Sequence, residues 1–224
     1  MPQQPTANAD SADNADGLPA NARHVGILGG SFNPIHIGHL FIGCAAADAF
    51  GLDRVLLMPC AVSPFKIGAA GLASNEDRLE MVRLSVEGDP LFVPCGLELE
   101  RGGVSYAFDT VQALRARHPD VHFSFIIGGD SLHGLEHWHR IGEMLELCDV
   151  ITVQRPGVEP PDMSGWPFSA AARERLLAGM IQGRLCEVSS TEIRRRIAEG
   201  RPIRYLVSPA VESHIRRRGL YAGA

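Results

Sequence analysis

The sequence predicts an α/β fold, namely a doubly wound, Rossmann-like parallel sheet with helices on both faces. Short apolar runs alternate with amphipathic segments from about residue 24 onward, and this alternation is typical of parallel strands joined by right-handed helical crossovers. Apolar residues make up 45% and charged residues 21% of the 224 residues, as in ordinary globular proteins. The chain is therefore long enough for a domain with a substantial core, which we place over residues 23–224.

The first 22 residues differ from the rest in composition. They are rich in Ala, Asn and Asp and contain no Lys or Arg. A signal peptide needs a basic start and an apolar centre, and this segment has neither. We expect residues 1–22 to form a disordered leader, because they bury too little apolar surface to offset the entropy of ordering.

The elements follow from periodicity and from turn residues. Phe123, Phe125 and Ile127 alternate as in a half-buried strand, Ser74 resembles the start of a capping box, and Gly51 closes a helical run. On such signals we expect strands over 25–28, 54–59, 91–93, 121–127, 149–154 and 185–188. We expect helices over 37–50, from 74 to about 86, and over 106–117, 132–147, 170–182, 191–199 and 209–218.

A glycine-rich string follows the first predicted strand. Gly29 and Gly30 let a ligand approach the backbone, and His36 and His39 lie on one face at the start of the next helix. A helix N-terminus with two imidazoles suits a phosphate group. The spacing matches neither the Walker loop nor the dinucleotide fingerprint. The string from Gly29 to His39 therefore predicts a different kind of triphosphate site.

A second string supplies further phosphate-binding groups. Ser189, Ser190 or Thr191 can cap the helix that follows, and Arg194 lies within its first turn. Arg forms bidentate contacts with phosphate. Taken alone, this string is equally consistent with a capped and solvated basic helix.

Together the two strings resemble the signatures of the nucleotidyltransferase superfamily with the His-x-Gly-His motif. From Val25 to Tyr221 the chain resembles, more narrowly, the bacterial nicotinate-nucleotide adenylyltransferases. Supporting segments are Ser63-Pro64-Phe65-Lys66, Glu100 to Tyr106 with Asp109-Thr110, Gly129-Asp130-Ser131, Trp138-His139 and Tyr205-Leu206-Val207. The resemblance implies that ATP and nicotinate mononucleotide react to nicotinate adenine dinucleotide and pyrophosphate, by direct attack on the α-phosphorus, with Mg²⁺ bound to ATP.

The resemblance also implies roles for particular residues. His36, His39 and Arg194 would be catalytic. The ATP-binding residues would be Gly29, Gly30, Ser31, Phe32, Lys66, Ser189, Ser190 and Thr191. The acceptor would contact Tyr106, Ala107, Asp109, Thr110, Asp130, Trp138 and His139, with Trp138 stacking on the pyridine ring. Three positions depart from the family pattern, because Phe65, Ala107 and Asn33 stand where His, Thr and Asp are common.

Other classes of function are less consistent with the composition. The net charge of −5 argues against a nucleic-acid-binding protein, although Arg216-Arg217-Arg218 forms a basic run. The five scattered cysteines indicate free thiols, and His133, His137 and His139 lack the partners of a protein metal site, so we expect none. No apolar run is long enough for a membrane span. We expect a cytoplasmic enzyme, for which a homo-oligomer is compatible with the sequence.

Three alternatives stay open. The acceptor could be nicotinamide mononucleotide or phosphopantetheine, with the same chemistry. The chain could be a nucleotide-binding regulatory module without catalysis, which would bind ATP and release no pyrophosphate. It could bind nucleic acid through its arginine runs, which would show as strongly salt-dependent binding.

Overall fold

The computed structural model describes residues 16–68, 71–184 and 186–223. Six strands form one parallel sheet in the order β3-β2-β1-β4-β5-β6. They are β1 His24–Gly30, β2 Arg54–Pro59, β3 Phe92–Pro94, β4 His122–Gly128, β5 Asp149–Gln154 and β6 Met180–Gln182. The order reverses between β1 and β4, and open sheets of this kind bind ligands beyond the carboxyl ends of the strands at such a point. The predicted doubly wound parallel fold is confirmed.

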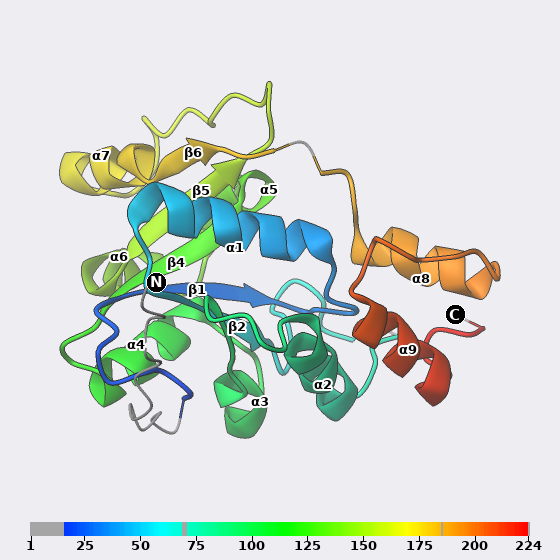
Figure 1. The fold of residues 1–224 in the computed structure, drawn as a ribbon. Coiled ribbons are helices and arrows are strands. Elements are labelled where there is room, and N and C mark those ends of the chain that lie inside the picture. The colour runs from blue at the N-terminus through cyan, green and yellow to red at the C-terminus, as the bar shows by residue number, and fades with distance from the viewer. Residues whose placement is uncertain (1–15, 69–70, 185, 224) are drawn as a thin grey trace, which may run out of the picture.

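Helices cover both faces of the sheet. The long helices are α1 Ile37–Phe50, α2 Asn75–Ser85, α4 Ala107–Arg117, α7 Ala170–Ala178, α8 Ser190–Ala198 and α9 Pro209–Arg218. The shorter ones are α3 Leu97–Arg101, α5 Gly129–Leu132, η1 Leu135–His137 and α6 Ile141–Leu147. In Figure 1, α8 and α9 stand beyond the carboxyl end of β1, far from α7 at the opposite edge. Most of the predicted elements are present with nearly the predicted bounds.

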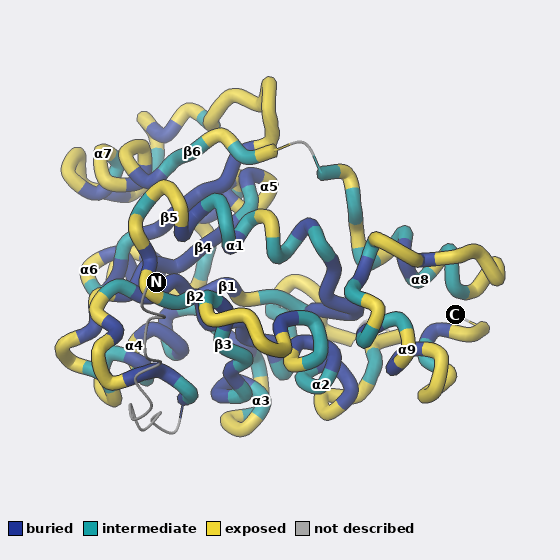
Figure 2. The backbone as a smooth tube through the Cα atoms, viewed as in Figure 1, coloured by how far each residue is buried: buried dark blue, intermediate teal, exposed yellow. Residues whose placement is uncertain are grey.

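Alternating side chains divide the core into two clusters. Phe123, Phe125 and Ile127 of β4 pack with α4, α6 and α7, whereas Ile126 faces the other cluster with α1, α2 and α9. The period of two in a strand places successive side chains on opposite faces. Figure 2 shows the buried residues concentrated along the central strands, with exposed residues on the outer helices and loops. Two apolar layers therefore hold the sheet rigid beneath the site.

The predicted helix over 132–147 is wrong. Gly134 and Arg140 adopt left-handed conformations with φ of 88° and 52°, and these interruptions leave α5, η1 and α6 as separate pieces. Trp138 lies between η1 and α6 in extended backbone. The amphipathic pattern continues across Arg140, and an arginine gives no sign of a left-handed conformation. The interruption there was therefore not predictable from the sequence. The break allows Trp138 to face the cavity described below.

The region around β6 also differs from the prediction. The predicted helix over 170–182 ends at Ala178, and the predicted strand over 185–188 is absent from its described residues 186–188. The strand instead spans Met180–Gln182, where it pairs in parallel with β5. The backbone N–H of Thr152 donates to Gly179 and that of Gly183 to Gln154, so pairing with β5 overrides the helical pattern. Helix α3 was not predicted.

Part of the predicted leader belongs to the folded unit. Leu18 is 1% exposed and Ala22 is 3% exposed, and both pack into the core cluster that contains α4. Asp16 accepts hydrogen bonds from Arg117 and His118, at 2.6 and 2.8 Å. Residues 16–22 of the predicted leader thus pack against the rest of the domain in this structure, through one buried Leu and one paired Asp. Residues 1–15 of the predicted leader lie outside the described residues.

Candidate active site

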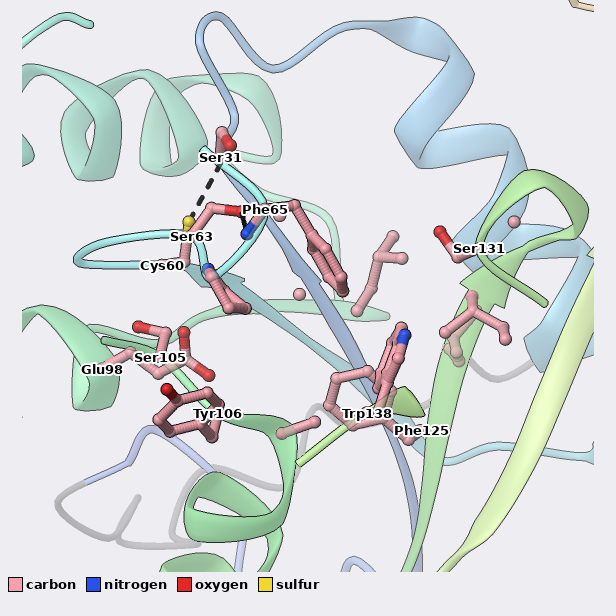
Figure 3. A pocket seen from close by; sticks show the side chains of 18 of the residues that line it. Ser31, Cys60, Ser63, Phe65, Glu98, Ser105, Tyr106, Phe125, Ser131 and Trp138 are labelled. Carbon is pink, nitrogen blue, oxygen red and sulfur yellow. Dashed lines mark hydrogen bonds between the residues drawn. The ribbon is translucent and has the colours of Figure 1, made fainter. Parts of the chain in front are cut away.

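A cavity of about 710 Å³ opens at the carboxyl ends of β1 and β4. Figure 3 shows side chains from the turn after β1, the loop after β2 and the segment before α6 pointing into it. Nine residues predicted for the site line this cavity, namely Gly29, Gly30, Ser31, His39, Lys66, Tyr106, Ala107, Trp138 and His139. Segments far apart in the sequence thus meet at the predicted edge of the sheet.

A second, smaller cavity of about 180 Å³ adjoins the first. His36, Asp130 and Arg184 are among the residues that line it, and His39 lines both cavities. Asp130 is exposed and accepts a hydrogen bond of 2.8 Å from Arg155. His39 therefore lies at the boundary between two binding spaces of different size.

The turn between β1 and α1 is fixed by a buried arginine. Arg78 of α2 is 1% exposed, and its guanidinium donates at 2.8 Å to the carbonyl oxygen of Ser31 and at 2.6 Å to Oδ1 of Asn75. Burying a charged group is costly unless hydrogen bonds compensate for the lost water. Arg78 therefore holds the backbone of the turn and leaves a positive charge beneath the larger cavity.

Asn33 ties the same turn to two other segments. Its Oδ1 accepts from the Tyr221 hydroxyl at 2.8 Å and from the Ala73 N–H at 3.0 Å, and its Nδ2 donates to the Gly71 carbonyl at 3.2 Å. A carboxylate in this place could not donate to Gly71. The departure from Asp to Asn thus serves the turn.

Helix α8 brings the second predicted string to the first. The Ser190 hydroxyl donates at 2.8 Å to the Pro34 carbonyl, and Arg194 donates at 2.8 Å to the Asn33 carbonyl. Ser189 caps α8 by accepting from the Glu192 N–H at 3.1 Å. Thr191 accepts from Arg194 at 3.3 Å. The two strings are therefore in direct contact, although more than 150 residues separate them in the chain.

The two histidines are close together and uncharged. Their ring centroids lie 3.7 Å apart, and the His36 backbone N–H donates to Nδ1 of His39 at 3.2 Å. Burial lowers the pKa of His36 to about 4. Burial, with the adjacent His36 and the positive charge of Lys66, holds the pKa of His39 well below its ordinary value. Because Nδ1 of His39 accepts a hydrogen bond, its single proton resides on Nε2, which makes Nε2 a donor.

Aromatic residues form the other end of the larger cavity. Trp138 is half-buried, and the edge of its ring meets Phe125 with centroids 6.0 Å apart at 88°. The Tyr106 and His139 rings lie 4.3 Å apart. Ala107 is the first residue of α4, where backbone N–H groups have no partner inside the helix. This end combines apolar ring faces with free N–H donors, which suits a planar ring that carries an acidic group.

Some predicted site residues lie outside both cavities. Phe32 is 1% exposed and packs edge-on against His39, with centroids 4.9 Å apart. Thr110 is fully buried and donates to Glu98 at 2.6 Å. Asp109 lines neither cavity. Phe32 and Thr110 therefore contact residues that line the larger cavity, namely His39 and Glu98.

Sequence reasoning missed several residues that shape the site. Arg78 and Tyr221 gave no signal, because an arginine in an amphipathic helix and a tyrosine near the end of the chain look like ordinary surface residues. Glu98 is 5% exposed and lines the larger cavity, and burial raises the pKa of its carboxyl group. Its Thr110 partner sits twelve residues away, in the segment that carries the family resemblance. Its position in the sequence close to that segment is the signal that could have pointed to Glu98 as a site residue.

The low pKa of His36 predicts how stability changes with pH. His36 stays neutral in the folded protein down to about pH 4, whereas an unfolded histidine takes up a proton near pH 6.5. The unfolded state therefore binds more protons in this window, so the free energy of unfolding should fall as pH decreases from about 6.5 to 4. The contribution of His36 is on the order of 3 kcal/mol.

Urea unfolding at several pH values between 7 and 4 measures this slope. His36→Asn should flatten it, and His137→Gln should not, because the side chain of His137 is 83% exposed. An unchanged slope in His36→Asn would show that the buried imidazole is not the source of the pH dependence.

Comparison with known proteins identifies the family. The model of the cytidylyltransferase-like family matches residues 27–196. A probable nicotinate-nucleotide adenylyltransferase of Halalkalibacterium halodurans is 42% identical over 200 residues, which cover 89% of this chain and 91% of that protein. A protein of the same description from Salinibacter ruber is 40% identical, covering 88% of this chain and 97% of its own.

Solved structures share the fold. Nicotinic acid mononucleotide adenylyltransferase of Plasmodium falciparum, complexed with NaAD, aligns with a TM-score of 0.68 at 16% identity, over 90% of this chain and 98% of that chain. A putative nicotinate-nucleotide adenylyltransferase of Vibrio parahaemolyticus aligns with a TM-score of 0.63 at 19% identity, over 90% and 97%. The resemblance seen in the sequence is confirmed: this chain belongs to the cytidylyltransferase-like family and, within it, to the nicotinate-nucleotide adenylyltransferases.

Proposed function

We propose that this protein transfers the adenylyl group of ATP to the phosphate of nicotinate mononucleotide, giving nicotinate adenine dinucleotide and pyrophosphate in the biosynthesis of NAD. Relatives about 40% identical over nearly the whole chain carry the name of this activity. The observation in the structure that carries the proposal is the pair of cavities that meet at His39. The reacting phosphates would meet at this boundary, with the pyridine ring beside Trp138 and the adenosine in the smaller space.

The reaction proceeds in this proposal by direct in-line attack. An oxygen of the mononucleotide phosphate forms a bond to the α-phosphorus of ATP, and the bond from that phosphorus to the bridging oxygen breaks. Pyrophosphate leaves with the electron pair, so no covalent enzyme intermediate forms. A reaction of this kind can depend on positioning and charge stabilisation alone.

The two histidines act as neutral donors in this mechanism. Nε2 of His39 donates to a non-bridging oxygen of the α-phosphate, where charge is redistributed in the transition state. Nδ1 of His36 is buried and has no hydrogen-bond partner among the described residues. An unpaired buried polar atom is unfavourable, and a phosphate in the smaller cavity would offer it a partner. Both assignments rest on the positions of these rings at the boundary.

Cationic and hydroxyl side chains would hold the rest of the triphosphate. Lys66 Nζ lies 3.5 Å from the Ser31 hydroxyl, at the phosphate side of the larger cavity. Arg194 and Ser190 reach the same turn from α8. We propose that Arg194 turns part of its guanidinium to a phosphate when ATP binds, while the turn keeps its anchors to Arg78 and Tyr221.

Mg²⁺ enters this scheme with ATP. Among the described residues, no group of three or more His, Cys, Asp or Glu side chains could hold a metal ion, which fits an ion carried mainly by triphosphate oxygens and water. Asp130 is the exposed carboxylate at the smaller cavity that could contact the hydrated ion or a ribose. The ion would supply charge neutralisation of the leaving pyrophosphate.

The compartment proposed for this reaction is the cytoplasm. All five cysteines of the chain are free, and three of them, Cys60, Cys95 and Cys148, are buried. Free thiols persist in reducing compartments such as the cytoplasm. Within the described part of the chain, no helix is long and apolar enough to cross a membrane.

Turnover with different acceptors tests the function. We expect pyrophosphate release with ATP, Mg²⁺ and nicotinate mononucleotide, and a kcat/KM at least about tenfold lower with nicotinamide mononucleotide, because free N–H donors favour an acid over a neutral amide. Phosphopantetheine should give no product. Equal or faster turnover of the amide would refute the acid preference, and ATP binding without pyrophosphate release would indicate a regulatory module.

The role of His39 gives a second test. His39→Ala should lower kcat by about 10²–10³-fold, the loss typical of removing one donor to a transition-state oxyanion. His122→Ala is the matched control, because His122 begins β4 at the opposite end of the strand from the cavities and lines neither of them. A near-normal kcat in His39→Ala would remove it from the reaction centre.

A further inference from the structure

Phe65 is an exposed aromatic side chain in an unusual place. Its ring lines the larger cavity, yet the residue is 72% exposed. Burying the apolar surface of a phenylalanine ring away from water is favourable. An exposed ring at the wall of a cavity therefore offers apolar surface that a bound ligand could cover. Among large apolar residues of the described chain, only Tyr205 is more exposed.

The Phe65 and Trp138 rings lie next to each other at the cavity. Their centroids are 6.0 Å apart and their planes are inclined by 51°, so the two rings do not stack on each other. Figure 3 shows the two side chains directed towards the same space. The two rings therefore form adjoining, inclined aromatic walls of the larger cavity.

The loop that carries Phe65 is anchored at its base. The Cys60 N–H donates to the Gly30 carbonyl at 2.9 Å, and the Ala61 N–H donates to the Ser105 hydroxyl at 3.0 Å. The Phe65 and Lys66 N–H groups both donate to Ser63, at 3.3 Å to its hydroxyl and 3.0 Å to its carbonyl. This turn directs Lys66 towards Ser31 and its neighbour Phe65 towards Trp138.

We propose that Phe65 binds the acceptor: its exposed ring and the Trp138 ring form adjoining walls of an aromatic slot that contacts a positively charged pyridinium ring. This inference rests on the proposed function. The ring nitrogen of a pyridine mononucleotide carries a positive charge, and aromatic faces attract cations through their quadrupole. In this proposal Lys66 contacts a phosphate group while its neighbour Phe65 contacts the pyridinium ring. Adjacent residues of one loop would thus recognise the two reacting parts.

Kinetics of loop variants test the slot. Phe65→Ala should raise the KM for nicotinate mononucleotide about 3- to 10-fold, as expected for loss of one aromatic contact, and should change the KM for ATP by less than about twofold. Phe65→Tyr should stay near the wild-type value. Ile67→Ala is the matched control, because Ile67 is 69% exposed in the same loop and does not line the cavity.

Fluorescence gives a readout that loop folding alone would not change. The chain has two tryptophans, so a Trp166→Phe background reports Trp138. Nicotinate mononucleotide should quench this emission, and Phe65→Ala should shift the titration midpoint by the same 3- to 10-fold. Equal changes in both KM values, or an effect of Ile67→Ala as large as that of Phe65→Ala, would overturn the slot.

The two proposals fail in different ways. If the wild-type protein does not turn over nicotinate mononucleotide, the proposed function is wrong. If the wild-type protein turns it over and Phe65→Ala leaves the KM for this substrate unchanged, only the slot is wrong.

Discussion

The buried guanidinium of Arg78 holds the turn on which the whole site depends. It reaches from α2 to the Ser31 carbonyl, while Tyr221 and Arg194 hold Asn33 from the end of the chain and from α8. Each of these contacts joins segments that are far apart in the sequence, so the turn takes its shape only when the domain is complete. The start of α1, with both histidines, follows directly from that turn.

This placement also explains the chemistry we propose for the histidines. A rigid turn packs the two rings together and removes them from water, which keeps them neutral. A neutral imidazole with Nδ1 occupied offers one directed donor rather than a diffuse charge. In the proposed mechanism, the positive charge that would attract a triphosphate comes instead from Lys66, Arg194 and the buried Arg78. Cationic side chains would thus attract the triphosphate, and the neutral imidazoles would donate directed hydrogen bonds to it.

Local signals in the sequence predicted much of the fold and the site. Alternation predicted β4, and capping residues predicted the end of α1 and the start of α2, because these elements depend on their own residues. The break at Arg140 and the position of β6 were not predictable, since they depend on pairing and packing with distant segments. The strings around His39 and Arg194 predicted the edge of the sheet at which the cavities open, and they meet at the turn after β1. Their supports, Arg78 and Glu98, become visible only when the fold brings them under the cavity.

The most direct test of the role of Arg78 is the KM for ATP of Arg78→Met, which keeps the length of the side chain and removes its charge and hydrogen bonds. If the turn depends on Arg78, the KM for ATP should rise about tenfold or more, since hydrogen bonds to charged groups contribute about 1.5–3 kcal/mol. Arg83→Met should have no effect, because the side chain of Arg83 on the same helix is 60% exposed. An Arg78→Met variant that folds and keeps a wild-type KM for ATP would show that the turn does not depend on Arg78.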